Sequence, residues 1–545
     1  MRNRRKKTPG ASVSSEMGND RDSKTAVAVT PAAALRSRPR LFAALEQAFP
    51  VRFHAGESES AASIHFCDNP EGTGTDCQRD GAGPRLLVGD NPGSGARSQT
   101  VAFAACGPLD QRLRGLAIAD PLDGPSLDSV GDDDVLAVAA GHATWTRSCG
   151  PGHIERVGSA LPELGADEAL RDLLLLRPLA TAALVSFLRT IASDGAFTPP
   201  EPRAAFLFDD PNLRWRSYGF IDFGRLLEHA DEHGYHAAMA MIPLDAGRQH
   251  RATVELFRRR GDRLSLVMHG NNHLSQELLR PEDDSEALMI AAQALRRAVD
   301  FEARHNLRMD RVMTPPHGMC SANSTRALAS LGYDALCAIH PLPWREQAPP
   351  ERPLSGWDPA EFADGCAVIP RLPLGTAASE LALRAFLGQP LVIYGHHGDL
   401  ADGLEPLAET AAAVNALGDV RWSSLGEIAT ANSATRRDGP LLRVRPYSHR
   451  LRLAIPEGVD SVAVEQPRGD TERLGGWSLN GSAPRPFGTV AELEPGIAKI
   501  RLQPTMPVDP AEVPPPTGRR IWPVVRRTAT ETRDRLRPLL RTGAA

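Results

Sequence analysis

Short apolar runs alternate with longer amphipathic stretches between residues 204 and 430 of this 545-residue chain. Runs of this length are typical of strands buried in a parallel sheet, and the longer stretches are typical of helices. The predicted strands are residues 204–208, 237–242, 264–268, 311–313, 335–338, 367–369, 391–394 and 420–422. The predicted helices are residues 222–233, 252–260, 285–305, 324–331, 378–387 and 404–417. Eight strands that alternate with helices predict a parallel (β/α) barrel of about residues 203–430.

The chain before this region shows two other patterns. Residues 1–30 are polar and irregular and start with a basic cluster, which predicts a disordered basic arm. Residues 31–195 mix apolar runs with two helical stretches, which predicts a separate N-terminal α/β domain. A proline-rich stretch at 198–203 is the predicted linker into the barrel.

The chain after the barrel changes character again. Residues 438–505 alternate apolar and polar positions with a period of two, which predicts a small C-terminal β-sandwich domain. That domain either binds carbohydrate or serves only as a packing module. Residues 506–545 form a basic tail, for which we expect a solvated arm; the alternative is a weak membrane-surface contact through the basic tails. Within the barrel, the proline-rich stretch 341–365 predicts a lid or an insertion that faces the substrate.

Ligand-capable side chains stand at the ends of two predicted strands. Asp209 and Asp210 end the first strand, and His269 ends the third, with His273 four residues later. On one turn of helix both imidazoles would share a face, and an aspartate could add a third ligand to a metal ion. A His-x-x-x-His pair alone is weak evidence because chance produces it often. Its combination with a strand-end aspartate predicts a zinc-type site that keeps one coordination position open.

Four motifs together resemble those of the polysaccharide deacetylase superfamily, which includes chitin and peptidoglycan deacetylases. They are Phe208-Asp209-Asp210, His269-x-x-x-His273, Pro315-Pro316-His317-Gly318 and Ile393-Tyr394-Gly395-His396, in this order. The resemblance covers about residues 203–430. It implies a distorted (β/α) barrel of seven or eight strands and the metal-dependent removal of an acetyl group from a sugar.

The resemblance also implies roles for individual residues. Asp210 would ligate the metal with His269 and His273, and Asp209 would be the general base. The backbone N–H of His317 would help to hold the oxyanion. His396 would be the general acid that protonates the leaving amine. Because His397 follows directly, the choice between these two histidines stays open, and Asp399 could orient either of them.

Three positions depart from the pattern of that superfamily. Pro211 and Gly270 replace a glycine and a hydroxyl residue, and Thr314 replaces the arginine that normally orients the base. Arg311 or Arg371 could substitute for that arginine. Thr314 favours the alternative of a metal-containing barrel that binds glycans or acts as a scaffold without catalysis. A glycosidase is a poor alternative, because adjacent aspartates do not flank a glycosidic bond at the required separation of about 5 Å or more.

Composition narrows the compartment and the partners. The net charge of −5 provides no basic field for nucleic acid, so we expect no nucleic acid partner. The carbohydrate substrate is what the resemblance implies. Seven cysteines without a Cys-x-x-Cys pair predict reduced thiols. No apolar segment follows the basic start, which predicts the absence of a secretory signal and a cytoplasmic location. The sequence thus predicts a cytoplasmic deacetylase that uses Zn²⁺ or another divalent metal.

Overall fold

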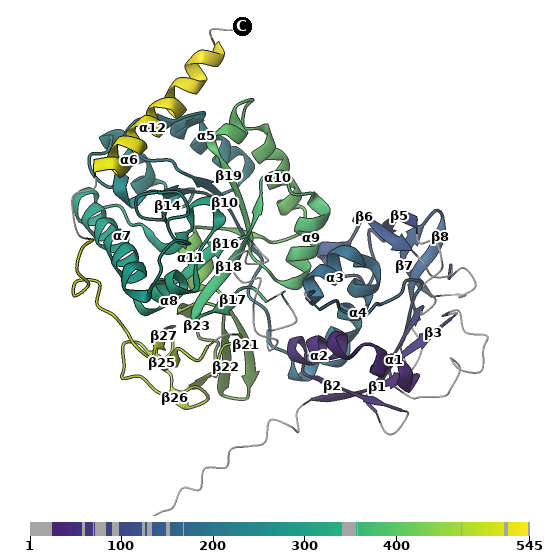
Figure 1. Ribbon diagram of the computed structural model, residues 1–545. Helices are drawn as coiled ribbons and strands as arrows, with labels where there is room; N and C mark the ends of the chain where they lie inside the picture. Colours follow the sequence, from purple (N-terminus) through teal and green to yellow (C-terminus); the bar gives the residue numbers. More distant parts are fainter. Residues whose placement is uncertain are drawn as a thin grey trace, which may run out of the picture.

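The computed structural model describes residues 24–56, 60–68, 70, 83–89, 97–122, 126–127, 133–148, 153–166, 168–339, 356, 358–469, 471–516 and 521–542. Its central part is a barrel, with a separate sheet on one side and two small sheets at one end (Figure 1). The predicted lid at 341–365 lies mostly outside the described residues, as do the first 23 residues of the predicted arm.

Seven parallel strands close the barrel. Their order around it is β13-β14-β15-β16-β18-β19-β10, and β10 pairs with β13 to complete the ring. The strands are β10 (Arg203–Asp209), β13 (Ala237–Met241), β14 (Leu264–His269), β15 (Asp310–Thr314), β16 (Ala335–Ala338), β18 (Cys366–Pro373) and β19 (Leu391–His396). The predicted eighth strand, β20 (Arg421–Trp422), pairs only with the first two residues of β10. The predicted barrel is therefore confirmed, with seven strands in the closed ring.

Alternation along each strand separates the two faces of the barrel. In β10, Phe206 and Phe208 belong to the apolar core that the strands share with the surrounding helices. Ala205 and Leu207 belong instead to a second core that fills the barrel and continues into the C-terminal sheets. Successive side chains of a strand point to opposite faces, so Asp209 continues the inward series. The lumen is thus apolar at its base and becomes polar where the strands end.

Helices connect the strands and cover the outside of the barrel (Figure 1). They are α5 (Phe223–His233), α6 (Arg251–Arg259), α7 (Asp284–His305), α8 (Ala322–Ser330), α9 (Ala378–Leu387) and α10 (Glu405–Asn415). A further helix, α11 (Leu425–Thr430), contributes Leu425, Ile428 and Ala429 to the core inside the barrel. It therefore closes the base, opposite the end that carries the aspartates. The short strand β17 (Glu361–Ala363) pairs antiparallel with the first residues of β18, at the base of the barrel.

The N-terminal region is one mixed sheet with the order β2-β1-β3-β4-β9-β8-β7-β5-β6. Four helices accompany it, and Leu383 and Phe386 of α9 complete its core, so it packs against the barrel. The prediction of a disordered arm over 1–30 is wrong at its end, because Thr25–Thr30 is strand β1. This strand pairs with both of its neighbours and buries Val27, Ala28 and Val29, an apolar run too short to be distinguished in the sequence. The elements are β1 (Thr25–Thr30), α1 (Ala32–Ser37), α2 (Pro39–Ala48), β2 (Val51–Ala55), β3 (Ala62–Cys67), β4 (Arg85–Gly89), β5 (Arg97–Phe103), β6 (Ala117–Leu122), β7 (Asp134–Ala139), β8 (His142–Arg147), β9 (Ile154–Val157), α3 (Leu170–Leu176) and α4 (Pro178–Ile191).

Two small sheets follow the barrel at its base. One has the order β21-β22-β24-β26 and the other β23-β27-β25, and both contribute to the core that continues from inside the barrel. The strands are β21 (Ser433–Asp438), β22 (Leu441–Pro446), β23 (Arg450–Ala454), β24 (Ser461–Val464), β25 (Leu474–Leu479), β26 (Val490–Glu492) and β27 (Ile497–Pro504). The pair β22–β24 is parallel, whereas the other pairs are antiparallel. Because these sheets share a core with the barrel, they are joined to it by packing as well as by the chain.

The C-terminal segment is a helix, α12 (Ile521–Thr542), which lies at the opposite end of the barrel from the two small sheets (Figure 1). The expectation of a solvated arm is wrong for this segment, because Arg527, Glu531 and Asp534 are buried against the barrel. Each of the three has a charged or imidazole partner more than 130 residues earlier in the chain, where the sequence pattern cannot reveal it. Within the described ranges, no helix is both long enough and apolar enough to cross a lipid bilayer.

Candidate metal centre and active site

Polar side chains from five barrel strands meet at one end of the lumen. Asp209, His269, Thr314, Arg371 and His396 each occupy the inward position in the alternation of their strand. The strand register confirms that they are neighbours: Asp209 lies opposite His396, and His269 lies opposite Thr314. Because all the strands are parallel, their carboxyl ends face the same rim, where a barrel carries its chemistry.

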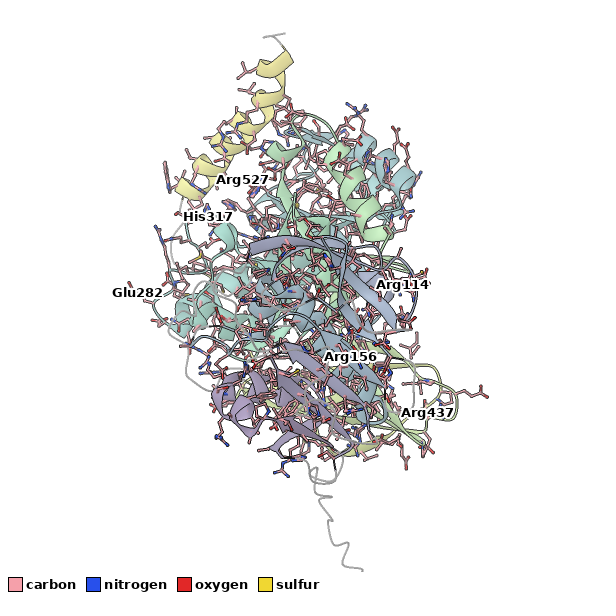
Figure 2. All side chains as sticks on the ribbon, turned by 90° about the vertical axis from the view of Figure 1, so that its right-hand side faces the viewer. Arg114, Arg156, Glu282, His317, Arg437 and Arg527 are labelled. Carbon is pink, nitrogen blue, oxygen red and sulfur yellow. The ribbon has the colours of Figure 1, made fainter. Side chains whose placement is uncertain are left out.

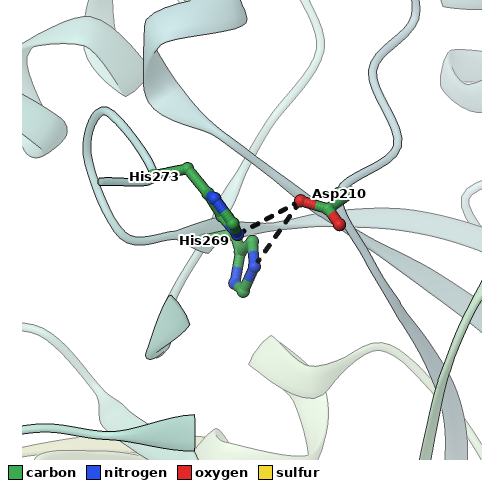
Figure 3. Close-up of side chains that lie close together, drawn as sticks. All are labelled: Asp210, His269 and His273. Atoms are coloured by element: carbon green, nitrogen blue, oxygen red, sulfur yellow. Dashed lines mark ion pairs between the residues drawn. The ribbon is translucent and has the colours of Figure 1, made fainter. Parts of the chain in front are cut away.

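The three predicted metal ligands lie together at this rim (Figure 3). The Asp210 Oδ1 atom is 3.3 Å from Nε2 of His273 and 3.9 Å from Nε2 of His269. One ligand atom from each residue lies within 4.8 Å of the other two. Asp210 reaches this position because its φ of 86° turns the chain sharply at the end of β10. The cluster contains one carboxylate and two imidazoles, a donor set that suits zinc and related divalent metals.

The contacts of Asp210 fit a cation. Its Oδ1 atom is buried and has no hydrogen-bond donor, although it faces both imidazoles. A buried acceptor without a donor is costly unless something positive neutralises it. Burial opposes ionisation of Asp210, but His273, His269 and Arg527 outweigh that effect and hold the pKa of the carboxyl below its usual range. The residues present therefore fit a divalent metal at this position.

The protonation of both histidines also suits ligation. The Thr314 hydroxyl donates to the Met268 carbonyl at 3.1 Å, so its oxygen can only accept from Nδ1 of His269 at 2.9 Å. The Thr314 carbonyl, 3.1 Å from the same nitrogen, is also only an acceptor. Nδ1 therefore carries the proton, and Nε2 presents its lone pair to Asp210. Burial and the neighbouring His269 lower the pKa of His273, which favours the neutral imidazole that a metal binds.

The two histidines do not share a turn of helix, so that part of the prediction is wrong. His269 is the last residue of β14, and His273 lies in a loop with a left-handed φ of 55°. Gly270 starts this loop with φ of 59°, and a Cβ there would lie 2.5 Å from Pro316 Cγ. The loop bends His273 back toward its strand and brings the rings to a centroid distance of 4.9 Å. Gly270 is needed for its conformation and its small size, which explains its departure from the superfamily pattern.

Glu277 holds the loop in place. Its buried carboxylate accepts the backbone N–H groups of Asn271, Asn272 and His273 at 2.8–3.0 Å. Burial raises the pKa of Glu277 despite these three donors. Three converging N–H groups form a concave anion site, and here the anion belongs to the protein itself. Glu277 could not be recognised from the sequence, because no local pattern shows which carboxylate closes a loop of this kind.

Arg371 pairs with Asp209 at the end of β10. Its Nη1 atom donates to both carboxylate oxygens of Asp209, at 3.0 and 3.1 Å, and both side chains are buried. The guanidinium also lies 4.2 Å from the ring centroid of Tyr394, which fixes its plane. Arg311 is excluded from this role, because it pairs with Glu302 at 2.7 Å. Of the two alternatives, Arg371 is therefore the residue that contacts Asp209.

His317 and His396 border the same rim. His317 lies on the turn after β15, with its ring 5.2 Å from that of His273. His396 ends β19, and its side chain is half exposed. Asp399 does not orient His396 through an imidazole hydrogen bond, since Nδ1 is 4.0 Å from Oδ2. Asp399 instead accepts the backbone N–H of His396 at 2.7 Å and so fixes the end of the strand.

His397 points away from this group. Its buried ring stacks on Phe220 at a centroid distance of 5.8 Å and lies edge-on to Tyr218. Gly219 leaves room for it, because a Cβ there would lie 2.2 Å from Nδ1 of His397. Its Nε2 atom is 3.6 Å from Oδ1 of Asp534 in α12. Of the two adjacent histidines, the structure thus places only His396 on the inward face with Asp209.

Helix α12 contacts the backbone of two predicted ligands. The buried guanidinium of Arg527 pairs with the buried carboxylate of Asp245 at 2.6 Å and donates to the Asp210 carbonyl at 2.8 Å. Arg526 donates to the carbonyl oxygen of His273. Figure 2 shows Arg527 and His317 at the same end of the molecule, near α12. The C-terminal helix therefore forms part of the rim, and Arg527 is a second residue beside the predicted ligands that the sequence did not reveal.

No protein-family model matches the chain, and no curated protein matches it either. Similar solved structures include polysaccharide deacetylases and family 4 carbohydrate esterases, and also an exo-type maltose-forming amylase. A Mycobacterium smegmatis protein assigned provisionally to the polysaccharide deacetylases is 17% identical, with TM-score 0.32, over 44% of this chain and 95% of its own. A family 4 carbohydrate esterase from Streptomyces lividans is 14% identical, with TM-score 0.26, over 44% of this chain and 100% of its own. A family 4 acetyl xylan esterase from Clostridium thermocellum, in complex with a cobalt ion, is 12% identical, with TM-score 0.26, over 41% of this chain and 89% of its own.

Proposed function

We propose that this chain is a metal-dependent hydrolase that removes an acetyl group from an N-acetylated sugar or glycan. The observation that carries the proposal is the grouping of Asp210, His269 and His273 beside the buried pair of Asp209 and Arg371, at the carboxyl rim of the barrel. Zinc or another divalent metal would be held by the first three residues. When bound there, such an ion acts as a Lewis acid that polarises a carbonyl and lowers the pKa of water toward neutrality.

Asp209 and His396 would divide the proton transfers of amide hydrolysis. Water adds to the acetyl carbon, and Asp209 accepts the proton that the water loses. Arg371 keeps this carboxylate in a fixed orientation. The backbone N–H of His317 would donate to the oxyanion that forms on the carbonyl oxygen. When the carbon–nitrogen bond breaks, His396 would supply a proton to the leaving nitrogen, which gives acetate and a free amine.

Arg371 also bears on the non-catalytic alternative. That alternative drew its support from Thr314, which stands where an arginine was expected. Because Arg371 pairs with Asp209, and Thr314 orients His269, neither position now argues against catalysis. A carbohydrate substrate and a cytoplasmic location remain parts of the proposal.

The test is acetate release from a panel of N-acetylated saccharides, measured together with the metal content of the purified full-length protein. We expect near-stoichiometric divalent metal and acetate release for the wild type, and loss of both in His273→Ala. His305→Ala, which changes a histidine on α7 that contacts the Gly247 carbonyl, is the matched control and should retain both. Saccharide binding without acetate release would favour the non-catalytic alternative, and full metal content in His273→Ala would refute the ligand assignment.

A further inference from the structure

Helix α12 presents an apolar stripe to solvent. Ile521, Trp522 and Leu540 are 72%, 67% and 73% exposed, and about half of the Val525 and Leu536 side chains is exposed. With 3.6 residues per turn, these five positions fall on one side of the helix, and Ala529 and Thr532 fall between them. Single exposed apolar residues are ordinary on a protein surface, whereas a row of large ones on one side of a helix marks a contact site.

The opposite side of α12 is polar and faces the barrel. Arg527, Glu531 and Asp534 are buried there, and they contact Asp245 at 2.6 Å, Arg214 at 2.8 Å and His397 at 3.6 Å, respectively. A surface helix normally packs its apolar side on the core and exposes its polar side. This helix has the reverse orientation, so its packing on the barrel does not explain the apolar stripe.

The charge of the exposed side is positive. The helix has six arginines and two acids, and both acids, Glu531 and Asp534, are turned toward the barrel. Arg533 and Arg537 border one edge of the stripe, with half or more of each side chain exposed. Both approach Asp534, which also lies 3.6 Å from Nε2 of His397. An apolar stripe that carries a tryptophan and is bordered by arginines matches the interface of an anionic bilayer.

We propose that the exposed side of α12, which we define as the stripe with Arg533 and Arg537, binds the surface of an anionic membrane. The helix lies in the plane of the headgroups, with its apolar stripe toward the acyl chains, and its polar side stays on the barrel. A second copy of the chain is a poorer partner, because it would bring two arginine-bordered surfaces together. Since Arg526 and Arg527 contact the backbone of His273 and Asp210, membrane binding would hold the metal-site rim about one helix diameter, ~10 Å, from the headgroups.

The test is co-sedimentation of the full-length protein with vesicles at low and at physiological ionic strength. One set of vesicles is phosphatidylcholine alone, and the other contains about 30% phosphatidylglycerol. The wild type should bind the anionic vesicles, less strongly at the higher ionic strength, and should bind the neutral vesicles weakly. The double variant Trp522→Ser/Leu540→Ser should lower the partition coefficient at least tenfold, because it removes two large apolar side chains. Arg533→Gln/Arg537→Gln should lower it about tenfold or more, on anionic vesicles only.

The matched control changes two apolar side chains of similar exposure outside α12. Val490→Ser/Ile497→Ser alters the small sheets at the other end of the barrel and should bind anionic vesicles as the wild type does. Thermal unfolding of each variant shows whether the fold is intact. The proposal is overturned if the wild type does not co-sediment with anionic vesicles, or if the control variant loses as much binding as the α12 variants. It is also overturned if the wild type self-associates without lipid and Trp522→Ser/Leu540→Ser restores the monomer.

Discussion

Thr314 determines which nitrogen of His269 can bind a metal. Its hydroxyl and carbonyl oxygens both accept from Nδ1, so Thr314→Val removes one of the two acceptors that fix the tautomer. Loss of a residue that orients a metal ligand typically lowers metal affinity about 10- to 100-fold. We expect a decrease of this size in competitive metal titrations of Thr314→Val. Thr325→Val is the control, since it removes a buried hydroxyl that donates to the Ser321 carbonyl in α8. Equal affinity in the two variants would contradict the role of Thr314.

His396 and His397 are adjacent in sequence but lie in different surroundings, which predicts different effects on catalysis. His396→Ala should slow the hydrolysis of amide substrates by about 10²- to 10⁴-fold, the usual contribution of a general acid. Activated aryl acetates should be affected far less, because their leaving group needs no proton. His397→Ala should mainly weaken the contact with Asp534 and change stability. If the selective amide defect appears in His397→Ala instead, the general acid is His397; if it appears in neither, the acid lies elsewhere.

The loop from Gly270 to His273 is the element that converts a strand end into a metal site. Gly270→Ala places a Cβ 2.5 Å from Pro316 Cγ and 2.8 Å from Glu277 Oε2 at a left-handed φ. Both atoms belong to the site, so the loop must move, and we expect loss of tightly bound metal. Gly318→Ala has a similar φ, of 69°, but its nearest neighbour is 3.8 Å away. It should cost about 1 kcal/mol of stability and retain the metal. Metal analysis of the two purified variants separates steric exclusion from backbone strain.

The residue that precedes strand β13, His236, is another buried histidine, and it makes stability depend on pH. His236 is fully buried between the Asp262 carbonyl and the Ser265 hydroxyl, and burial lowers its pKa from 6.5 to about 4. In the unfolded chain His236 therefore binds a proton near pH 6.5, whereas in the folded chain it binds this proton only near pH 4. The stability from neutral His236 is complete above pH 6.5 and is lost as the pH falls toward 4, by about 3 kcal/mol in all.

Thermal unfolding of the wild type and of His236→Gln at pH 7.5 and pH 5 tests this. The decrease in unfolding temperature between the two pH values should be smaller in His236→Gln. His142→Gln, at an exposed position of β8, should behave as the wild type does. An equal pH dependence in His236→Gln and the wild type would show that His236 is not the titrating group.

At the scale of the whole molecule, local patterns predicted the barrel well, because each strand is an apolar run and each helix has its own period. The strand-end aspartates and histidines could be placed at one rim, since parallel strands all end on the same side. The conformation of the loop after His269 could not be predicted, because it depends on Glu277 and on left-handed backbone angles. The pairing of Arg371 with Asp209 spans 162 residues. A contact between residues so far apart in the chain forms only once the barrel has folded, so a local sequence pattern cannot predict it.

The docking of α12 is the most distant of these contacts, and it yields the last prediction. Arg527 and Asp245 form a buried ion pair and lie 282 residues apart in the chain. Arg214 also pairs with Asp245, and the side-chain amide of Asn212 donates to it. Removing one partner leaves the other buried with less compensation, which typically costs about 3–5 kcal/mol. Arg527→Met should therefore lower the unfolding temperature and release α12 from the barrel, which is seen as faster amide hydrogen exchange over Ile521–Thr542.

Arg533 provides the comparison on the same helix. Its side chain is 60% exposed, and Arg533→Met should change stability by no more than about 0.5 kcal/mol and leave exchange over α12 slow.

A double variant gives the sharper test. Arg527→Met/Asp245→Asn removes both charges, so it no longer buries an uncompensated carboxylate. This double variant should recover part of the unfolding temperature, so that the two changes cost less together than the sum of each alone. Strict additivity would mean that Asp245 and Arg527 do not stabilise each other. Equal exchange over α12 in Arg527→Met and Arg533→Met would mean that the helix is held on the rim by other contacts.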